Sequence, residues 1–417
     1  MEPKPQEQNN GRMWTVAVYM AADSNIYPYA LEDINEMEAG LARLAKGSAQ
    51  LEVLVLMDGS PVGDSKVLRI RPDPGPVNTK IISEVLDDQG AVIPASKEVD
   101  TGDQETLRHF GDYVTDKFPA THHALVLWQH HNSLRPVDRT HRYSSSFFNL
   151  IGSLNSIGER RPGAASTSFA VDDHGGALLL SDLNPILASA RKILGRSIDI
   201  LGFDTDQMQH LETAYQIKDL AGILVASEDI EPGRGWAYDV LLARLSTQPD
   251  MEPSQLARIM VDSFVQSFEK TGNAATLTAL DVHRTSMEVV PALNALAAEL
   301  KAHLPAETEP IRTARLNAQR FYASDAIDLG DFLKQYAQSQ PPVRIFKAMT
   351  RLQQTMEGAR ISHRFTGLDV QKATGYQIYF PPANQGYDTR YDDPRQFRFA
   401  EINGWREFLK TFAQTEP

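Results

Sequence analysis

Two apolar segments of the chain run directly into polar side chains that could do chemistry. HALVLW is followed by the stretch QHHN, which contains His130 and His131, and IDILGF is followed by DTDQ, which contains Asp204 and Asp206. An imidazole held beside a second polar group can act as a general base for a nucleophile. If both segments are strands of one sheet, the side chains of His130 and Asp206 should lie within about 6 Å of each other, the range of direct charge pairing.

The absence of cysteine from the 417 residues limits this chemistry. The chain has no disulfide, no thiolate metal ligand and no thiol nucleophile. A hydroxyl nucleophile would have to be Thr205 or Ser133, with His130 as its base. Thr205, however, should point away from Asp204 and Asp206 on an extended backbone, because side chains alternate across a strand.

A metal site is an alternative use of the same residues. His130, His131, Asp204 and Asp206 offer imidazole and carboxylate groups, which suit zinc, manganese or iron. A metal ion held there would activate water and support hydrolysis without a thiol. An ion pair between an acidic strand end and a histidine is the simpler interpretation of the pattern.

Acidic turns elsewhere could line a pocket for an Arg or Lys side chain, or bind calcium. Asp173 lies in VDDHGG and Glu228 in SEDIE, although neither stretch has the regular spacing of a calcium loop. Trp236, in GRGW, could form a pocket wall because an aromatic face receives a guanidinium well. Solvated turns, and a core position for Trp236, are the alternatives.

The elements that position these residues alternate between apolar, β-branched runs and amphipathic helices. Strands are predicted at 15–22, 51–59, 122–131 and 197–206, and helices at 27–45, 103–118 and 181–194. This alternation predicts an α/β fold with a mainly parallel sheet flanked by helices. Ligands of such sheets bind at the carboxyl ends of the strands, where the polar stretches lie.

The chain divides into regions of different character. Residues 1–13 are predicted to be a disordered tail, and 14–245 to be the α/β domain, interrupted by a long irregular insertion at 132–168. The segment 246–417 is helix-rich and is expected to pack on the first domain. Its two strand signals are ATLTALDV and GYQIYFPP.

Charge and composition exclude several classes of protein. A formal net charge of −13 and a hydrophobic fraction of 42% indicate a folded protein without a general phosphate-binding surface. The sequence shows no run long enough to cross a membrane and no signal peptide. We therefore expect neither nucleic acid nor membrane as a partner, and a cytoplasmic location.

Longer stretches resemble the clostripain family of cysteine peptidases, which has a caspase-like fold. VAVYMAADSNIYPYALEDINEME is similar to that family's first strand, acidic loop and first helix, and ALVLWQHHNS to its strand ending in Trp-x-His-Gly. DILGFDTDQMQHLETAYQIKDLAGILVASEDIEPGRGWAYD resembles the stretch around the catalytic cysteine, which typically reads Gly-Phe-Asp-Ala-Cys-Leu-Met. The resemblance is specific from about residue 14 to 240 and looser beyond.

The resemblance assigns roles to individual residues. His130 falls on the catalytic base, Asp206 on the cysteine nucleophile, and Asp204 on an aspartate of the pocket that receives a basic side chain. A carboxylate replaces the thiolate, Gln207 replaces the following leucine, and His131 replaces the glycine after the histidine. Family members also cleave themselves between these two strands, whereas this chain, without a thiol, is expected to stay intact.

The resemblance therefore implies a catalytically inactive homologue, a pseudoprotease, that retains a cleft for Arg- or Lys-containing peptides. Asp204, Asp173, Glu228 and Trp236 are the expected lining, and the partner is a peptide or protein with basic residues. No cofactor is required, although calcium is used by some family members. Two alternatives remain: a metal-assisted hydrolase using His130, Asp204 and Asp206, and a scaffold whose cleft is vestigial.

Overall fold

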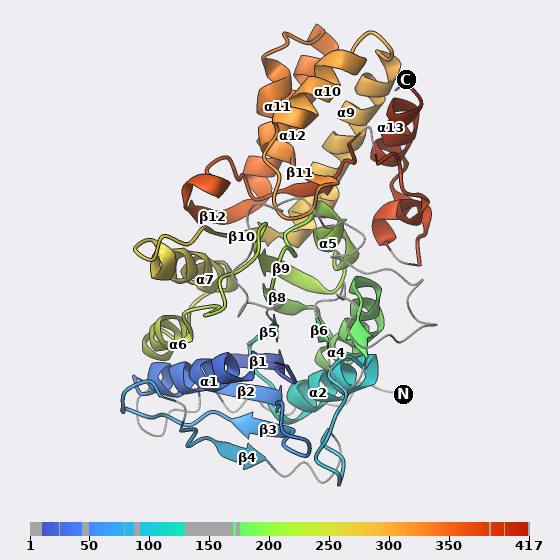
Figure 1. Cartoon of the computed structure of the whole chain (residues 1–417). Coiled ribbons are helices and arrows are strands. Elements are labelled where there is room, and N and C mark those ends of the chain that lie inside the picture. Colours follow the sequence, from blue (N-terminus) through green and yellow to red (C-terminus); the bar gives the residue numbers. More distant parts are fainter. Residues whose placement is uncertain are drawn as a thin grey trace.

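The described strands build one large mixed sheet at the centre of the molecule (Figure 1). A computed structural model describes residues 11–24, 26–43, 50–78, 80–86, 92–129, 170–171, 176–382, 385–395 and 397–415. The order across the sheet is β12-β10-β9-β8-β5-β1-β2-β3-β4. Their bounds are β1 Trp14–Ala21, β2 Leu51–Asp58, β3 Lys66–Arg69, β4 Glu84–Leu86, β5 His122–Trp128, β8 Ile198–Asp204, β9 Ala221–Ala226, β10 Ala275–Asp281 and β12 Arg360–Thr366.

The strands at the centre of the sheet, β2, β1, β5, β8 and β9, run parallel to one another. Antiparallel strands extend the sheet at both sides. Alternate side chains of β1 enter two different cores: Val16 and Val18 pack on one face, and Ala17 and Tyr19 on the other. A strand buried on both faces is apolar throughout, which explains the continuous apolar runs of the sequence.

Helices cover both faces of this sheet (Figure 1). One face packs against α1 Tyr27–Leu41, α6 Tyr238–Thr247 and α7 Pro253–Phe268. The other packs against α2 Gln104–Lys117, α4 Leu183–Leu194 and α5 Leu211–Gln216. The predicted α/β class, with a mainly parallel sheet flanked by helices, is confirmed.

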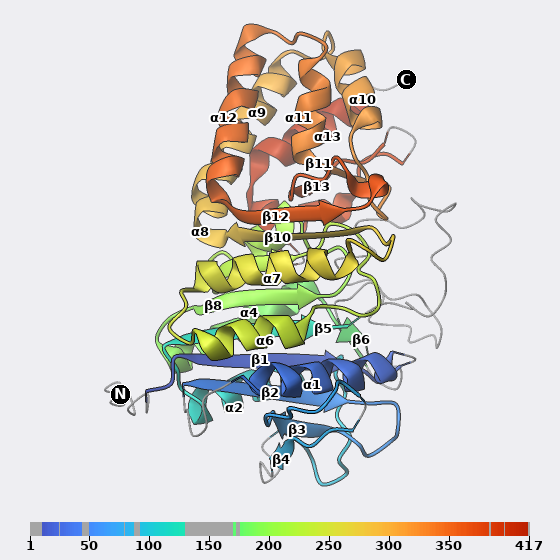
Figure 2. The same ribbon diagram turned by 90° about the vertical axis from the view of Figure 1, so that its left-hand side faces the viewer.

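The C-terminal part of the chain contributes to the same sheet and adds a group of helices beyond it (Figure 2). β10 and β12 both come from the segment predicted as the second region, so one sheet contains strands from either side of residue 245. The division of the chain into two domains at that residue stays a prediction. The further elements are α8 Val282–Arg284, α9 Val290–Ala302, α10 Thr308–Asn317, α11 Leu329–Ala337, α12 Val343–Ala359, α13 Asn403–Gln414, and a small sheet of β11 Ala326–Asp328 with β13 Gln377–Tyr379.

A short antiparallel pair, β6 Ala170–Val171 with β7 Ala177–Leu178, lies between β5 and α4 in the chain. The predicted insertion at 132–168 and most of the predicted tail, residues 1–10, lie outside the described residues. Among the helices that the structure describes, none combines the length and the apolar character that a membrane crossing requires.

Candidate functional site

The strands that carry the predicted histidine and aspartates are neighbours in the sheet. β5 and β8 pair in parallel, and their last residues, Trp128 and Asp204, are partners in the register. The backbone N–H of Gln129 continues this pairing by donating to the carbonyl of Asp204 at 3.1 Å. His130 and His131 lie outside the described residues. The predicted approach of His130 to Asp206 therefore stays a prediction, while the pairing of the two strands is established.

Asp204 ends β8 with a fully buried carboxylate. Its Oδ2 accepts hydrogen bonds from the hydroxyl of Tyr238 at 2.7 Å and from the backbone N–H of Trp236 at 3.3 Å. The buried carboxyl of Glu231 lies beside it. Burial and the charge of Asp204 raise the pKa of Glu231 well above its usual range. Glu231 therefore favours its protonated form beside Asp204.

Asp206 lies two residues further and is less buried. Its Oδ1 accepts the backbone N–H of Glu231 at 2.7 Å. The next residue, Gln207, has a φ of +55°, in the left-handed region that costs a side-chain-bearing residue about 1 kcal/mol. The Oε1 atom of Gln207 accepts the backbone N–H of Ala323 at 3.1 Å. The segment after Asp206 is thus anchored to the C-terminal part of the chain.

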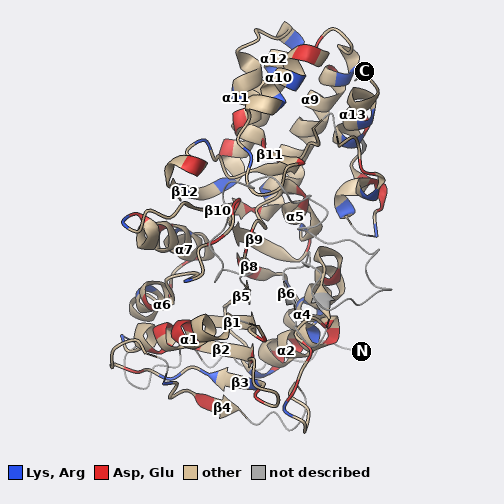
Figure 3. Cartoon of the chain, viewed as in Figure 1, with Lys and Arg blue, Asp and Glu red and all other residues tan. Residues whose placement is uncertain are grey.

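Acidic side chains of α1 extend the group around Asp204. Asp33 accepts the indole N–H of Trp128 at 2.7 Å, and burial together with Asp204 raises its pKa well above the usual range. Burial, followed by Asp239, raises the pKa of Glu36 to about 7. Figure 3 shows the acidic positions along α1. We call Asp33, Glu36, Asp204, Asp206 and Glu231 the acidic cluster.

One basic side chain, Arg234, reaches the rim of the acidic cluster. Its guanidinium lies 3.7 Å from a carboxylate oxygen of Glu36, and its side chain is 72% exposed. An ion pair this exposed adds about 1 kcal/mol at most. Arg234 therefore adds little to the stability of the cluster.

Trp236 is predicted either to line a pocket or to lie in the core. The structure shows it 1% exposed, with its ring packed on the backbone of β8. A Cβ placed on Gly202 would lie 2.7 Å from the tip of that ring, so glycine is needed there. The tryptophan fixes the loop after β9 against the strand that carries Asp204.

The structure does not place the other two predicted pocket residues, Glu228 and Asp173, in the acidic cluster. Glu228 does not bond to the acidic cluster in the described contacts: its carboxyl accepts the backbone N–H of Gly375 and meets Asp328. Asp173 lies outside the described residues. The prediction missed Asp33 and Tyr238, although an aspartate on the apolar face of the helix at 27–45 was a visible signal.

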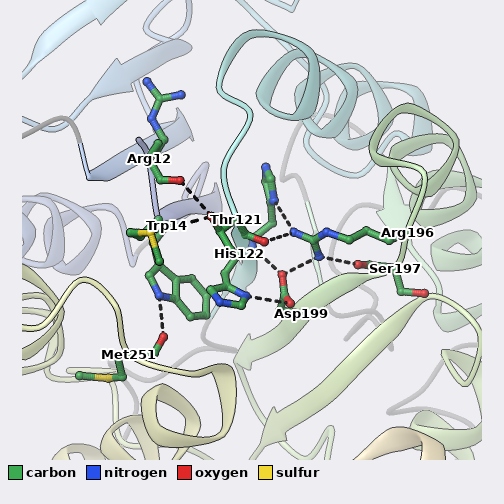
Figure 4. Close-up of polar contacts among 10 residues, drawn as sticks. Arg12, Trp14, Thr121, His122, Arg196, Ser197, Asp199 and Met251 are labelled. Carbon is green, nitrogen blue, oxygen red and sulfur yellow. Dashed lines mark hydrogen bonds and ion pairs between the residues drawn. The ribbon is translucent and has the colours of Figure 1, made fainter. Parts of the chain in front are cut away.

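The histidines at the start of β5 lie at the amino ends of the strands, and Figure 4 shows His122 there with Asp199 and Arg196. His122 Nδ1 lies 3.2 Å from Asp199 Oδ1, and Arg196 donates to Asp199 Oδ2 at 2.8 Å. Burial lowers the pKa of His123 to about 4, with Arg196 adding to the effect. These groups hold the amino ends of the strands together and lie away from the acidic cluster.

A second group of carboxylates follows β1 and β2. Asp23, Asp58 and Glu98 each offer an oxygen within 4.8 Å of the others. Three carboxylate oxygens this close together would suit calcium, an ion that some members of the family use. By contrast, Asp204 Oδ2 already accepts two hydrogen bonds, from the Tyr238 hydroxyl and the Trp236 N–H, and this does not favour a metal-assisted hydrolase.

Comparison with known proteins agrees with this geometry. The family model described as the clostripain family matches residues 18–146 and 163–411. Clostripain of Hathewaya histolytica is 26% identical over 251 residues, which are 57% of this chain and 43% of clostripain. The chain thus covers less than half the length of that relative.

Solved structures show the same fold over nearly the whole chain. A secreted C11 cysteine protease from Bacteroides thetaiotaomicron, in complex with an irreversible peptide inhibitor, has a TM-score of 0.62 at 17% identity and covers 95% of this chain and 99% of its own. An inactive zymogen C11 protease from Parabacteroides distasonis has a TM-score of 0.59 at 16% identity and covers 98% and 99%. The sheet, its flanking helices and the family model agree: the chain belongs to the clostripain family and has the caspase-like fold of C11 proteases, but contains no cysteine.

Proposed function

We propose that this chain is a catalytically inactive member of the clostripain family that binds a basic peptide segment at the carboxyl edge of its sheet. The observation that carries the proposal is Asp206. This carboxylate stands where the family resemblance places the cysteine, and it accepts the backbone N–H of Glu231.

A carboxylate in this position is a poor nucleophile. Its attack on an amide would give a mixed anhydride, which lies uphill of the peptide, whereas a thiolate gives a thioester. Loss of the nucleophile in a well-studied triad leaves only about 10³- to 10⁴-fold of the rate enhancement. We therefore expect no peptidase turnover above background with arginyl or lysyl amide substrates.

The charge of the acidic cluster supports recognition of a cation. Asp206 and Glu36 are its less buried carboxyl groups, and Arg234 is highly exposed beside them. A guanidinium presented by a peptide would bring charge-assisted hydrogen bonds to these two carboxyl groups. The buried Asp204 would support this binding indirectly, because it holds in place the loop that carries Trp236 and Glu231.

Titration calorimetry with matched peptides tests this proposal. A peptide ending in Arg should bind, and Asp204→Asn or Asp206→Asn should weaken binding by about 1 to 3 kcal/mol. Asp116→Asn is the control, because that carboxylate is 57% exposed on α2, and it should bind as the wild type does. Equal binding of peptides ending in Arg and in norleucine would contradict the proposal and favour a scaffold.

A further inference from the structure

Two fully buried carboxyl groups meet where the loop after β9 contacts the C-terminal part of the chain. Glu228 lies at the start of that loop, and Asp328 lies at the end of β11, where it caps the N-terminus of α11. Their carboxyl groups bind consecutive residues, since Asp328 accepts the backbone N–H of Thr374 and Glu228 that of Gly375, and this brings the two carboxyls together inside the protein. Two carboxyls this close can bond to each other only through a proton, because two carboxylates have no donor between them.

The surrounding donors show which carboxyl carries the proton. Asp328 Oδ1 accepts the backbone N–H of Asp331 at 2.6 Å and the hydroxyl of Thr374 at 2.7 Å, and its Oδ2 accepts the backbone N–H of Thr374 at 2.6 Å. Three donors stabilise the charged form of Asp328. Glu228 accepts the N–H of Gly375 at 2.9 Å through Oε2, and its buried Oε1 makes no hydrogen bond among the described residues, so Oε1 is the oxygen that can carry the proton.

The place where Glu228 and Asp328 meet, which we call the junction, joins three separate segments of the chain. Gly375 has a φ of +90°, and a Cβ there would lie 2.7 Å from Thr278 of β10, so the close approach of its N–H to Glu228 requires glycine. Gln209 Nε2 donates to the carbonyl of Gly375 at 3.0 Å, and Gln377 Nε2 donates to the carbonyl of Glu228. The loop that begins at Glu228 continues to Glu231 and Trp236 of the site described above.

We propose that the Glu228–Asp328 pair is a pH-sensitive latch, which holds the loop 227–236 to β11 and α11 while the two carboxyls share a proton and loosens when that proton is lost. Loss of the proton puts two negative charges in contact inside the protein. This inference does not depend on whether the acidic cluster binds peptides.

The charged groups near the latch do not replace the proton. Arg360 of β12 donates to the carbonyl of Thr374 at 2.8 Å, and Tyr376 donates its hydroxyl to the carbonyl of Met356. Burial lowers the pKa of His363, whose Nε2 lies 2.9 Å from the Ala373 carbonyl, to about 4.

Two further contacts complete the surroundings. The carboxylate of Asp331 bonds to the backbone N–H of Gln319 and to the side-chain amide of Gln335. On the β10 side the neighbour is the neutral Thr276 hydroxyl, which receives the N–H of Glu228. Since the pKa of His363 is about 4, this side chain is already neutral above about pH 5, and its charge does not change in the range where the two carboxyls lose their proton.

The direction of the pH effect follows from linkage. Burial and then Asp328 raise the pKa of Glu228 well above its usual range, and burial raises the pKa of Asp328 to about 6. In the open junction both groups would titrate near 4, so the closed junction binds more protons at neutral pH. The closed state is therefore fully favoured below about pH 4 and loses stability as the pH rises through the raised values.

Amide hydrogen exchange on the full chain tests the latch. After correction for intrinsic exchange, the opening constant of peptides covering 328–331 and 374–377 should rise as the pH increases above about 5, by up to about ten-fold per pH unit for each proton lost on opening. Glu228→Gln should remove this rise, because the amide donates to Asp328 without a titrating proton. Glu309→Gln, at a side chain that is 74% exposed, is the matched control and should keep the wild-type slope.

Asp328→Asn is a second variant that tests the latch. An amide nitrogen in place of either oxygen would face an N–H or O–H donor, so this variant should open the junction more than Glu228→Gln does. Carbon-detected NMR of the wild-type Glu228 carboxyl should show a pKa well above its usual value of about 4, without any substitution. An unchanged pH slope in Glu228→Gln, or a Glu228 that titrates near 4, would overturn the latch.

Discussion

At the scale of single residues, the site differs from an active peptidase by more than one atom. Asp206 accepts the backbone N–H of Glu231, and Gln207 is held in a left-handed conformation by its bond to Ala323. These contacts fix the segment that would have to carry a nucleophile. Restoring the thiol alone should therefore restore only part of the chemistry.

Asp206→Cys tests this expectation. A thiol beside His130 would have its pKa lowered by an imidazolium, so we expect slow alkylation by an arginyl halomethyl ketone, detected as an intact-mass increase. Amide turnover should stay low until His131→Gly is added, because Gln207 and His131 both depart from the family pattern. Asp206→Ser is the control and should not be alkylated. Brisk turnover from the single change would show that the rest of the site is preserved, and no alkylation would show a closed cleft.

Glu36→Gln should change stability in a pH-dependent way. The pKa of Glu36 is raised to about 7 by burial and by Asp239, so folding retains a proton that the unfolded chain loses near pH 4. The native state therefore loses stability as the pH rises from about 4 through 7. The variant should gain roughly 1 to 3 kcal/mol over the wild type at about pH 8, less the small contribution of the Arg234 pair, and almost nothing at about pH 4.

Urea unfolding at the two pH values measures the difference. The exposed Glu309→Gln should show no comparable gain at either pH, because its side chain is 74% exposed. An equal gain for Glu36→Gln at both pH values would mean that burial of its charge is not the cause.

At the scale of elements, the loop 227–236 links the acidic cluster to the end of β11, where Asp328 lies. Its first acidic residue, Glu228, meets Asp328, and its later residues reach Asp204 and Asp206. Trp236 fastens its end to β8 over Gly202. The position of the loop therefore depends on packing against β8 as well as on carboxyl contacts.

Gly202→Ala should displace this loop. The new methyl would lie 2.7 Å from the ring of Trp236 and 3.4 Å from Val126, an overpacking that costs about 1 to 3 kcal/mol. Gly111→Ala on α2 is the matched control: nothing lies within 4 Å of the added Cβ, and a helical alanine should add about 0.5 to 1 kcal/mol. Urea midpoints compare the two, and a Gly202→Ala protein as stable as the wild type would contradict the packing role of Trp236.

At the scale of the whole molecule, the N-terminal and C-terminal parts of the chain contribute strands to one sheet, and the chain has no thiol. β10 and β12 join the strands of the first region, so the C-terminal part cannot separate without breaking sheet hydrogen bonds. Where the protein resides is still a prediction. The Bacteroides thetaiotaomicron protease of the same fold is a secreted protein, whereas the sequence favoured the cytoplasm.

We predict that the purified chain does not cleave itself and stays intact. Self-cleavage between β5 and β8 would need a nucleophile, although arginines are available there at positions 135, 139, 142, 160 and 161. Prolonged incubation of purified protein, followed by intact-mass analysis, should show a single species. Two fragments that form in a protease-free preparation and vanish in His130→Ala would show that the site is active after all.

The sequence by itself determined the parts of the molecule that depend on local pattern. Continuous apolar runs identified β1, β2, β5 and β8, because strands buried on both faces need no polar alternation. The absence of cysteine and the placement of Asp204 at a strand end were also visible. β12 was missed, since RISHRFT is only half-buried and carries no clear alternation.

The tertiary structure decided which distant groups meet. Asp204 receives the hydroxyl of Tyr238 and faces Asp33 of α1, and Glu228 pairs with Asp328 rather than with the acidic cluster. These contacts join residues far apart in the chain, and each depends on how the sheet is ordered and how the C-terminal part packs on it. Hydrophobic periodicity reports the faces that a helix or strand buries, but it carries no information about which carboxyl lies opposite another. The proton-sharing pairs could therefore be recognised only in the folded protein.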